Sequence, residues 1–329
     1  MQIEHIILQM LNTNQNVLLC AKEELEMSQE TIETFVETKL KKVFSSNLRK
    51  AAQFYPESAA KKQLEAYNKK ECSFIELTDW FGNRLFEIKQ QYDCYEESAL
   101  LIAEVVHEER RYLVLLDQMY RFAMTCYVDF EIERNTLLEK PTLSNNVLKG
   151  DVACIIELSD LSLSIIEEPR IIQGSSTLLY LTQLLSGTST PSFEESRKVI
   201  ETIGKKMSEQ YEMDSLKVTS KMKQMMKEAV ESNEQIDVEE IAHQVFQTVP
   251  YAKDVFVSEV KQAGIASAIS TEYAHLPKSG KVTKLTTDQQ IEVILPVEFM
   301  NESNCFEMIH HDDDTYSILI KNIKHLKSR

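Results

Sequence analysis

The stretch ALLIAEVVHEERRYLVLLDQ, residues 99–118, indicates the fold class of the first half of the chain. Two apolar runs, Ala99–Val106 and Tyr112–Gln118, flank the polar connection His107–Arg111. Apolar runs of this length on either side of a short polar segment are typical of two antiparallel strands joined in a hairpin. The sequence therefore predicts antiparallel pairing here, rather than the βαβ units of a parallel sheet.

The residues before this hairpin predict two strands and then helices. The strands are Ile3–Leu11 and Asn16–Met27, and Ser28 is the predicted N-cap of a helix that Pro56 ends. Further helices are predicted at Glu57–Asn68 and Phe74–Gln91. Apolar residues recur at helical spacing on the inner face of the last helix, at Phe74, Leu77, Phe81, Leu85 and Ile88.

After the hairpin, the sequence predicts two more strands, Phe122–Glu131 and Val152–Leu158. Arg134–Gly150 between them is predicted to be a polar loop that contains Pro141. The composition changes around Glu167–Ser176, and a domain boundary is predicted there. We therefore expect an N-terminal antiparallel α+β domain over residues 1–166 and a C-terminal domain over residues 167–329.

The C-terminal domain is predicted to be helical and to end in a small antiparallel sheet. Its predicted helices are Thr177–Leu185, Ser192–Gln210, Asp214–Ser232, Val238–Phe246 and Ala252–Ala263. Its predicted strands are Ile291–Phe299, Cys305–Ile309 and Tyr316–Ile320. Only a short Asp-rich segment separates the last two strands, which is hairpin spacing.

The composition is that of an ordinary globular protein, with 43% hydrophobic and 27% charged residues among 329. We expect a cytoplasmic protein, because the first ten residues lack a basic leader and no apolar run approaches the roughly 20 residues that cross a bilayer. The six cysteines form no CxxC pair and are predicted to be reduced. The net charge of −16 disfavours phosphate-bearing partners, although the local field at one patch decides docking.

The sequence contains no motif for phosphate binding, nucleotide binding or nucleophilic catalysis, so the hypothesis of an enzyme has only the cluster His310–Asp314 behind it. Neighbouring residues on a strand point to opposite faces, so His310–His311–Asp312–Asp313–Asp314 is interpreted as a turn rather than a metal site. His107–Glu108–Glu109 is interpreted as a solvated hairpin turn rather than an acid/base group. We therefore predict no catalytic residue and no metal ligand.

Basic residues gather on two consecutive predicted helices. If these helices are antiparallel neighbours, eight cations could form one positive face that contacts phosphates. The candidate DNA-binding residues are Arg197, Lys198, Lys205, Lys206, Lys217, Lys221, Lys223 and Lys227. The alternative is an ordinary solvated face, because Glu209, Glu212, Glu228 and Glu231 interleave with them.

Two further groups of basic residues lack the interleaved aromatic residues of a single-strand binder. The first comprises Lys39, Lys41, Lys42, Arg49, Lys50, Lys61 and Lys62. The second comprises Lys278, Lys281, Lys284, Lys321, Lys324, Lys327 and Arg329.

Three short apolar segments, DVACIIEL at Asp151–Leu158, AGIASAI at Ala263–Ile269 and SILIKNI at Ser317–Ile323, resemble the bacterial nucleoid-associated protein family of the YejK type. The order of elements and the length resemble the family from end to end. The resemblance implies a cytoplasmic protein on the bacterial nucleoid that associates with double-stranded DNA and contacts a type II topoisomerase or another nucleoid protein. It implies no enzymatic activity and no cofactor. A homodimer would pair two binding faces, as in other proteins that coat DNA.

One segment departs from the family pattern. After the DVACIIEL strand the family tends to place a glycine among lysines and arginines, whereas Gly174 here has Gln173 before it and Ser175–Thr177 after it. This departure leaves two functional hypotheses open. One is direct binding of duplex DNA through lysine–phosphate contacts with little sequence readout, and the other is a protein–protein adaptor that reaches the nucleoid through a DNA-handling partner.

Overall fold

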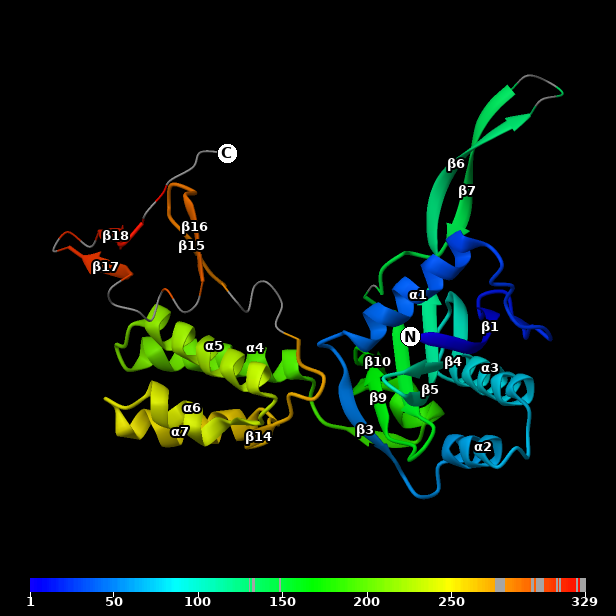
Figure 1. Cartoon of the computed structure of the whole chain (residues 1–329), viewed down its shortest axis with the longest axis horizontal. Coiled ribbons are helices and arrows are strands. Elements are labelled where there is room, and N and C mark those ends of the chain that lie inside the picture. The colour runs from blue at the N-terminus through cyan, green and yellow to red at the C-terminus, as the bar shows by residue number, and fades with distance from the viewer. Residues whose placement is uncertain are drawn as a thin grey trace. The chain divides into compact units, whose positions relative to one another are not determined.

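The computed structural model describes residues 1–129, 131, 134–147, 149–275, 282–296, 299, 305–311, 313, 315–323 and 325. Its contacts divide the chain into two units, Met1–Thr190 and Pro191–Arg329. Both units mix helices with antiparallel strand pairs, as Figure 1 shows, so the predicted α+β class is confirmed.

The first unit is built on one sheet of eight strands in which every neighbouring pair is antiparallel. In sheet order the strands are β12 (Gly187–Ser189), β3 (Lys50–Phe54), β9 (Leu163–Ile166), β8 (Val152–Glu157), β5 (Arg110–Met119), β4 (Glu97–His107), β1 (Gln2–Asn12) and β2 (Val17–Leu19). The predicted hairpin is β4–β5. Its two turn residues, Glu108 and Glu109, have φ of 48° and 65°, the left-handed values that a tight hairpin turn needs.

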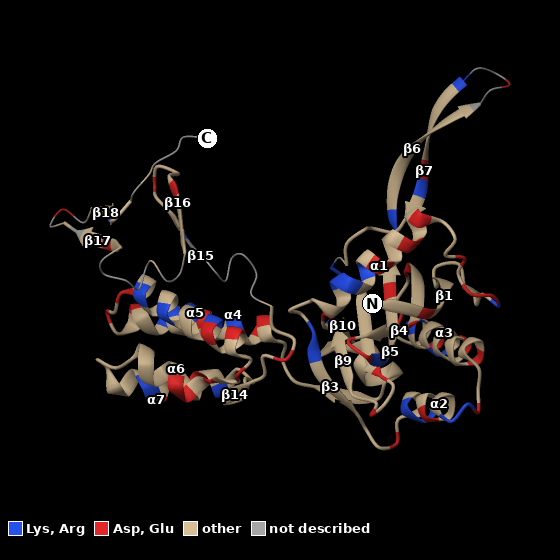
Figure 2. Ribbon diagram, viewed as in Figure 1, with Lys and Arg blue, Asp and Glu red and all other residues tan. Residues whose placement is uncertain are grey.

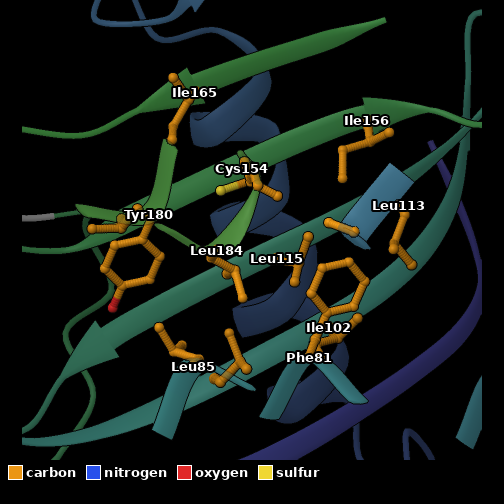
Figure 3. Packing of buried hydrophobic residues seen from close by; sticks show 14 of the residues in the cluster. Phe81, Leu85, Ile102, Leu113, Leu115, Cys154, Ile156, Ile165, Tyr180 and Leu184 are labelled. Carbon is orange, nitrogen blue, oxygen red and sulfur yellow. The ribbon is translucent and has the colours of Figure 1, made fainter. Parts of the chain in front are cut away.

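Helices cover both faces of this sheet. On one face, α1 (Glu30–Phe44) packs Val36, Leu40 and Val43 against the sheet. On the other face, α2 (Ala59–Asn68), α3 (Phe74–Gln91) and the short π-helix η1 (Tyr180–Leu184) enclose a second core. Figure 3 shows this core, where Phe81 and Leu85 of α3 meet Ile102 and Leu115 of the sheet. All five residues predicted for the inner face of α3 are buried.

Three predictions in the first ninety residues were wrong. The strand predicted at Asn16–Met27 is only the three-residue β2. The N-cap of α1 is Gln29, while the hydroxyl of Ser28 donates a hydrogen bond to Glu26 at 2.6 Å. The helix ends at Phe44 and not at Pro56, because β3 follows it and pairs with β9 and β12 inside the sheet.

The polar loop predicted at Arg134–Gly150 was also wrong in its first half. Residues Arg134–Thr142 form the strand β7, which pairs along its whole length with β6 (Arg121–Asp129). Pro141 lies near the base of this two-stranded ribbon, opposite Phe122. Proline is tolerated there because a strand with only one neighbour leaves half of its N–H groups unpaired.

The division between the units follows Thr190, whereas the sequence predicted a boundary between residues 166 and 167. The intervening segment contains β10 (Arg170–Ile172), β11 (Ser175–Thr177) and η1, the last in place of the predicted helix Thr177–Leu185. Leu179, Tyr180, Leu181, Leu184 and Leu185 are part of the core under the sheet. The segment therefore belongs to the first unit.

A buried ionic network holds this segment in place. Lys89 of α3 has no exposed side-chain surface, and its Nζ lies 2.5 Å from Asp117 and 2.8 Å from Glu96. Tyr180 donates its hydroxyl proton to the same Asp117, and Arg170 forms an ion pair with Glu96 at 3.0 Å. Two cations and two carboxylates therefore balance within the core. Burial alone would lower the pKa of Lys89, but the charges of Asp117 and Glu96 outweigh it and raise that pKa.

The carboxylate of Glu167, which is distant in sequence from η1, lies beside the N-terminus of this helix. It accepts hydrogen bonds from the backbone N–H groups of Tyr180 and Leu181 at 2.8 and 3.1 Å. Burial raises the pKa of Glu167 from 4.5 to about 7, although those two hydrogen bonds act to lower it. Between these pH values the folded chain binds a proton that the unfolded chain has released.

We therefore expect the first unit to lose stability as pH rises from about 4.5 to about 7, by at most about 3 kcal/mol from this group. Glu167→Gln does not titrate, so the stability of the variant minus that of the wild type should be larger at pH 7.5 than at pH 4.5. Urea unfolding followed by the fluorescence of Trp80, the one tryptophan in the chain, measures this difference. Stability curves that run parallel from pH 4.5 to 7.5 would contradict it.

The second unit packs four helices around a methionine-rich core that includes Met207, Met222 and Met226. The helices are α4 (Phe193–Gln210), α5 (Ser215–Ser232), α6 (Val238–Val245) and α7 (Pro250–Gln262), which confirms the four predicted there. Three strand pairs accompany them: β13 (Ile236–Asp237) with β14 (Ala268–Ile269), β15 (Val282–Thr286) with β16 (Glu292–Pro296), and β17 (Phe306–His310) with β18 (Tyr316–Ile320). The predicted tail hairpin is β17–β18, whereas β15 was missed. Among the described helices, none is both long and apolar enough to span a membrane.

Candidate nucleic-acid interface

The candidate cations lie on α4 and α5, which are joined by the short turn Tyr211–Asp214 and lie side by side in Figure 1. Ser192 and Glu195 form a capping box at the start of α4, and Asp214 accepts hydrogen bonds from two N–H groups at the start of α5. Gly204 allows the close approach of the helices, because a Cβ there would lie 2.5 Å from Met222. The predicted antiparallel pairing of the two helices is therefore present.

Three of the four cations on α4 are paired with carboxylates. Arg197 contacts Glu194 at 2.8 Å and Glu201 at 2.5 Å, and the hydrogen bond to Glu194 is the largest contribution that raises its pKa. Lys198 lies 3.5 Å from Glu194, and Lys206 lies 2.8 Å from Glu259 of α7. Figure 2 shows Lys and Arg alternating with Asp and Glu along these helices. Lys205 is exposed and forms no ion pair with any described residue.

The four lysines of α5 divide into two pairs. Successive residues of an α-helix are separated by 100° around its axis. Lys217 and Lys221 therefore project in a direction about 120° away from that of Lys223 and Lys227. Ser220, which is buried, lies between the pairs. Lys227 has only 14% of its side chain exposed and lies 3.9 Å from Glu231. The eight candidate cations therefore do not form one continuous positive face.

Lys217 and Lys221 line a groove of about 850 Å³ together with Lys321, which follows β18. The apolar part of the groove comes from Met213, Leu216, Val245, Val249, Phe306 and Met308. Lys217 lies 3.7 Å from Asp214 and Lys321 forms an ion pair with Glu307, whereas Lys221 forms no ion pair with a described residue. The groove is thus amphipathic, with one uncompensated ammonium group. No local pattern indicated that Lys321 would lie beside α5, because a hundred residues separate Lys321 from Lys221.

Five of the seven basic residues in the first group make contacts within the fold. Lys39, Lys42 and Lys50 each donate a hydrogen bond to a backbone carbonyl, and Arg49 donates to the Ser164 hydroxyl and to Phe44 O. Lys41 lies 2.6 Å from Glu37. In the C-terminal group, Lys284 lies 2.5 Å from Glu292, while Lys278, Lys281, Lys324, Lys327 and Arg329 lie outside the described residues.

The two sequence clusters that suggested chemistry both form turns. Asp313 accepts hydrogen bonds from the backbone N–H and the hydroxyl of Thr315, and His311 Nε2 lies 2.7 Å from the Ser317 hydroxyl. Asp312 and Asp314 lie outside the described residues. In the described part of the chain, no three His, Cys, Asp or Glu side chains are placed to share a metal ion. His107 packs edge-on against Phe44 beside the β4–β5 turn.

The segment that departs from the family pattern forms the hairpin β10–β11. Gln173 and Gly174, with φ of 49° and 80°, make its turn. Glycine adopts this backbone without the steric cost that a Cβ imposes, which explains Gly174 without any ligand. Arg170, the one cation of the two strands, forms the ion pair with Glu96 described above.

Comparison with known proteins assigns the chain to a family. The family model described as nucleoid-associated protein YejK matches residues 7–327, which includes the greater part of both units. No curated protein sequence matches the chain. A match over nearly the whole length supports the resemblance of the three apolar segments, two of which form β8 and β18. The chain therefore belongs to the family of the nucleoid-associated protein YejK.

Proposed function

We propose that this protein is a non-enzymatic component of the bacterial nucleoid that binds double-stranded DNA through lysine–phosphate contacts, with little readout of base sequence. The observation that carries the proposal is a set of four lysines on α4 and α5, in a family named for its association with the nucleoid. Lys205, Lys221 and Lys223 form no ion pair with any described residue, and Lys217, whose side chain is 82% exposed, has only a long ion pair with Asp214 at 3.7 Å.

The proposed contacts are weak and electrostatic. A net charge of −16 repels DNA at long range, so only lysines that project from the surface reach phosphates. Side chains on exposed helix faces can do this without entering a groove, and contacts to phosphates carry no base information. We therefore expect modest affinity and strong dependence on salt.

Binding of the purified chain to a fluorescently labelled duplex, measured by anisotropy at several salt concentrations, tests the proposal. Four phosphate contacts should give a slope of about −3.6 in a plot of log affinity against log salt. Duplexes of unrelated sequence should bind within about threefold of one another, because little discrimination comes from phosphate contacts. Undetectable binding at low salt would overturn direct contact.

A second candidate function is a protein–protein adaptor that is recruited to the nucleoid by a DNA-handling partner such as a type II topoisomerase. The groove beside α5 favours it, because apolar side chains and one uncompensated lysine suit an amphipathic segment of a protein better than a phosphate backbone. A pull-down from nuclease-treated extract tests this function. Partners that stay bound after nuclease treatment support the adaptor, and partners that are all lost contradict it.

A further inference from the structure

The strand β17 has one free edge. Among the described strands its partner is β18, and the two are antiparallel. Cys305, which precedes β17, accepts a hydrogen bond from the N–H of Lys321 at 2.8 Å, and this bond fixes the alternation of the ladder. Glu307 therefore directs its backbone groups toward β18, whereas Phe306 and Met308 direct theirs away from it. These outward N–H and C=O groups bond to no described residue.

This free edge runs along the groove beside α5. The side chains of Phe306 and Met308 lie on one face of the hairpin and that of Glu307 on the other, yet all three residues line the groove. A groove that contacts both faces of a strand passes along one of its edges, and β18 occupies the other edge. The unpaired backbone groups of β17 therefore border a groove of about 850 Å³.

The remaining lining matches an extended peptide. It includes Leu216 of α5, Val245 of α6 and Val249 just before α7. An extended peptide would bond its own N–H and C=O groups to β17, and every second side chain would point to the same side and reach these apolar residues. A helix bonds its backbone groups internally, so it would leave those of β17 unpaired.

The charges of the groove favour a peptide over nucleic acid. The carboxylates of Glu212, Asp214 and Glu307 lie in the lining, and a phosphate backbone would meet all three. Lys221 is partly buried and forms no ion pair with a described residue. Its ammonium group can therefore receive one carboxylate from a peptide.

We propose that this groove binds an extended segment of a partner protein, which adds as a further strand to the free edge of β17 and places an Asp or Glu side chain beside Lys221. The segment carries apolar residues at alternate positions. The inference rests on the adaptor function, the second candidate above, and specifies the chemistry of the partner that this function needs.

Selection of phage-displayed random peptides on the full-length chain tests the groove. Enriched peptides should have apolar residues at alternate positions and an acidic residue. Lys221→Glu should weaken their binding about tenfold or more, because repulsion replaces the attraction between Lys221 and the carboxylate. Lys223→Glu makes the same charge change on the same helix but outside the lining, so binding should stay within about twofold. Failure to enrich any peptide, or equal losses in the two variants, would overturn the proposal.

N-methylation of a selected peptide tests the strand geometry on the wild-type chain. In an added strand only alternate N–H groups bond to β17. Methylating that set should abolish binding, and methylating the other set should leave binding nearly unchanged. A bound helix would be sensitive at every interior position, because each interior N–H is bonded within the helix. Equal sensitivity at all positions would therefore contradict an added strand.

The pull-down separates failure of the groove from failure of the adaptor function. Partners that survive nuclease treatment with the wild type but are lost with Lys221→Glu support both. Partners that survive equally with both chains would exclude the groove and leave the adaptor function standing. Loss of all partners from the wild type would contradict the adaptor function and, with it, this inference.

Discussion

Replacing Lys89 by Met should lower the free energy of unfolding of the first unit by about 3–5 kcal/mol. The methionine fills much of the space of the lysine stem, so packing changes little. The loss arises because Arg170 alone then faces two nearly buried carboxylates, Asp117 and Glu96, so one negative charge has no cation to balance it. No described residue donates a hydrogen bond to Oδ1 of Asp117, so after the substitution the Tyr180 hydroxyl is the side-chain donor left to stabilise this carboxylate among the described residues.

Urea unfolding followed by Trp80 fluorescence measures the effect, because Trp80 lies on α3, the same helix as Lys89. Lys41→Met is the matched control. It removes an ion pair with Glu37 of similar length, 2.6 Å, from the surface of α1, where solvent screens the charges. Its unfolding midpoint should stay almost unchanged.

Adding Asp117→Asn to Lys89→Met should restore part of the lost stability, because it removes the carboxylate that has lost its cation. If the Lys89→Met variant were as stable as the Lys41→Met variant, the charges of the buried network would contribute nothing to the free energy of unfolding.

Local sequence patterns predicted the helices and strands in which apolar, buried residues recur at a regular spacing. The inner face of α3 and the hairpin β4–β5 follow from spacing alone, because each side chain lies where its own helix or strand directs it. The predicted starts of α4 and α5, at Ser192 and Asp214, coincide with the observed N-cap residues. Such features depend on residues only a few positions apart in the sequence, so they can be predicted from the sequence alone.

The features that sequence missed depend on distant partners. β3 is only five residues long, and its place in the sheet comes from pairing with β9 and β12, more than a hundred residues away. The domain boundary was misplaced because Tyr180 bonds to Asp117 and Glu167 holds η1, contacts that no composition change signals. β7 was missed because its residues are exposed and show no alternation.

The candidate interface was predictable in residue type but not in arrangement. Helical spacing correctly placed the four lysines of α5 away from the stripe of Val218, Met222 and Met226. It could not show that Glu259 of α7 neutralises Lys206 or that the tail brings Lys321 beside Lys221. The charge balance of a surface is a property of the tertiary fold.

Charge reversal at Lys205, Lys217, Lys221 and Lys223 to Glu should reduce affinity for duplex DNA about a thousandfold at 100 mM salt. A lysine that no longer contacts a phosphate no longer displaces counterions from the DNA on binding. The slope of log affinity against log salt should therefore change from about −3.6 toward zero. The four side chains are outside the buried core, so the fold should persist, as circular dichroism would verify.

The control for this variant holds the net charge equal. Charge reversal at Lys61, Lys62, Lys69 and Lys70, in or just after α2, also changes the net charge by eight, from −16 to −24. If lysines of α4 and α5 contact phosphates directly, this control keeps its slope and loses little affinity. Equal losses in both variants would mean that the overall charge governs binding, and an unaffected α4–α5 variant would assign the contact to another surface.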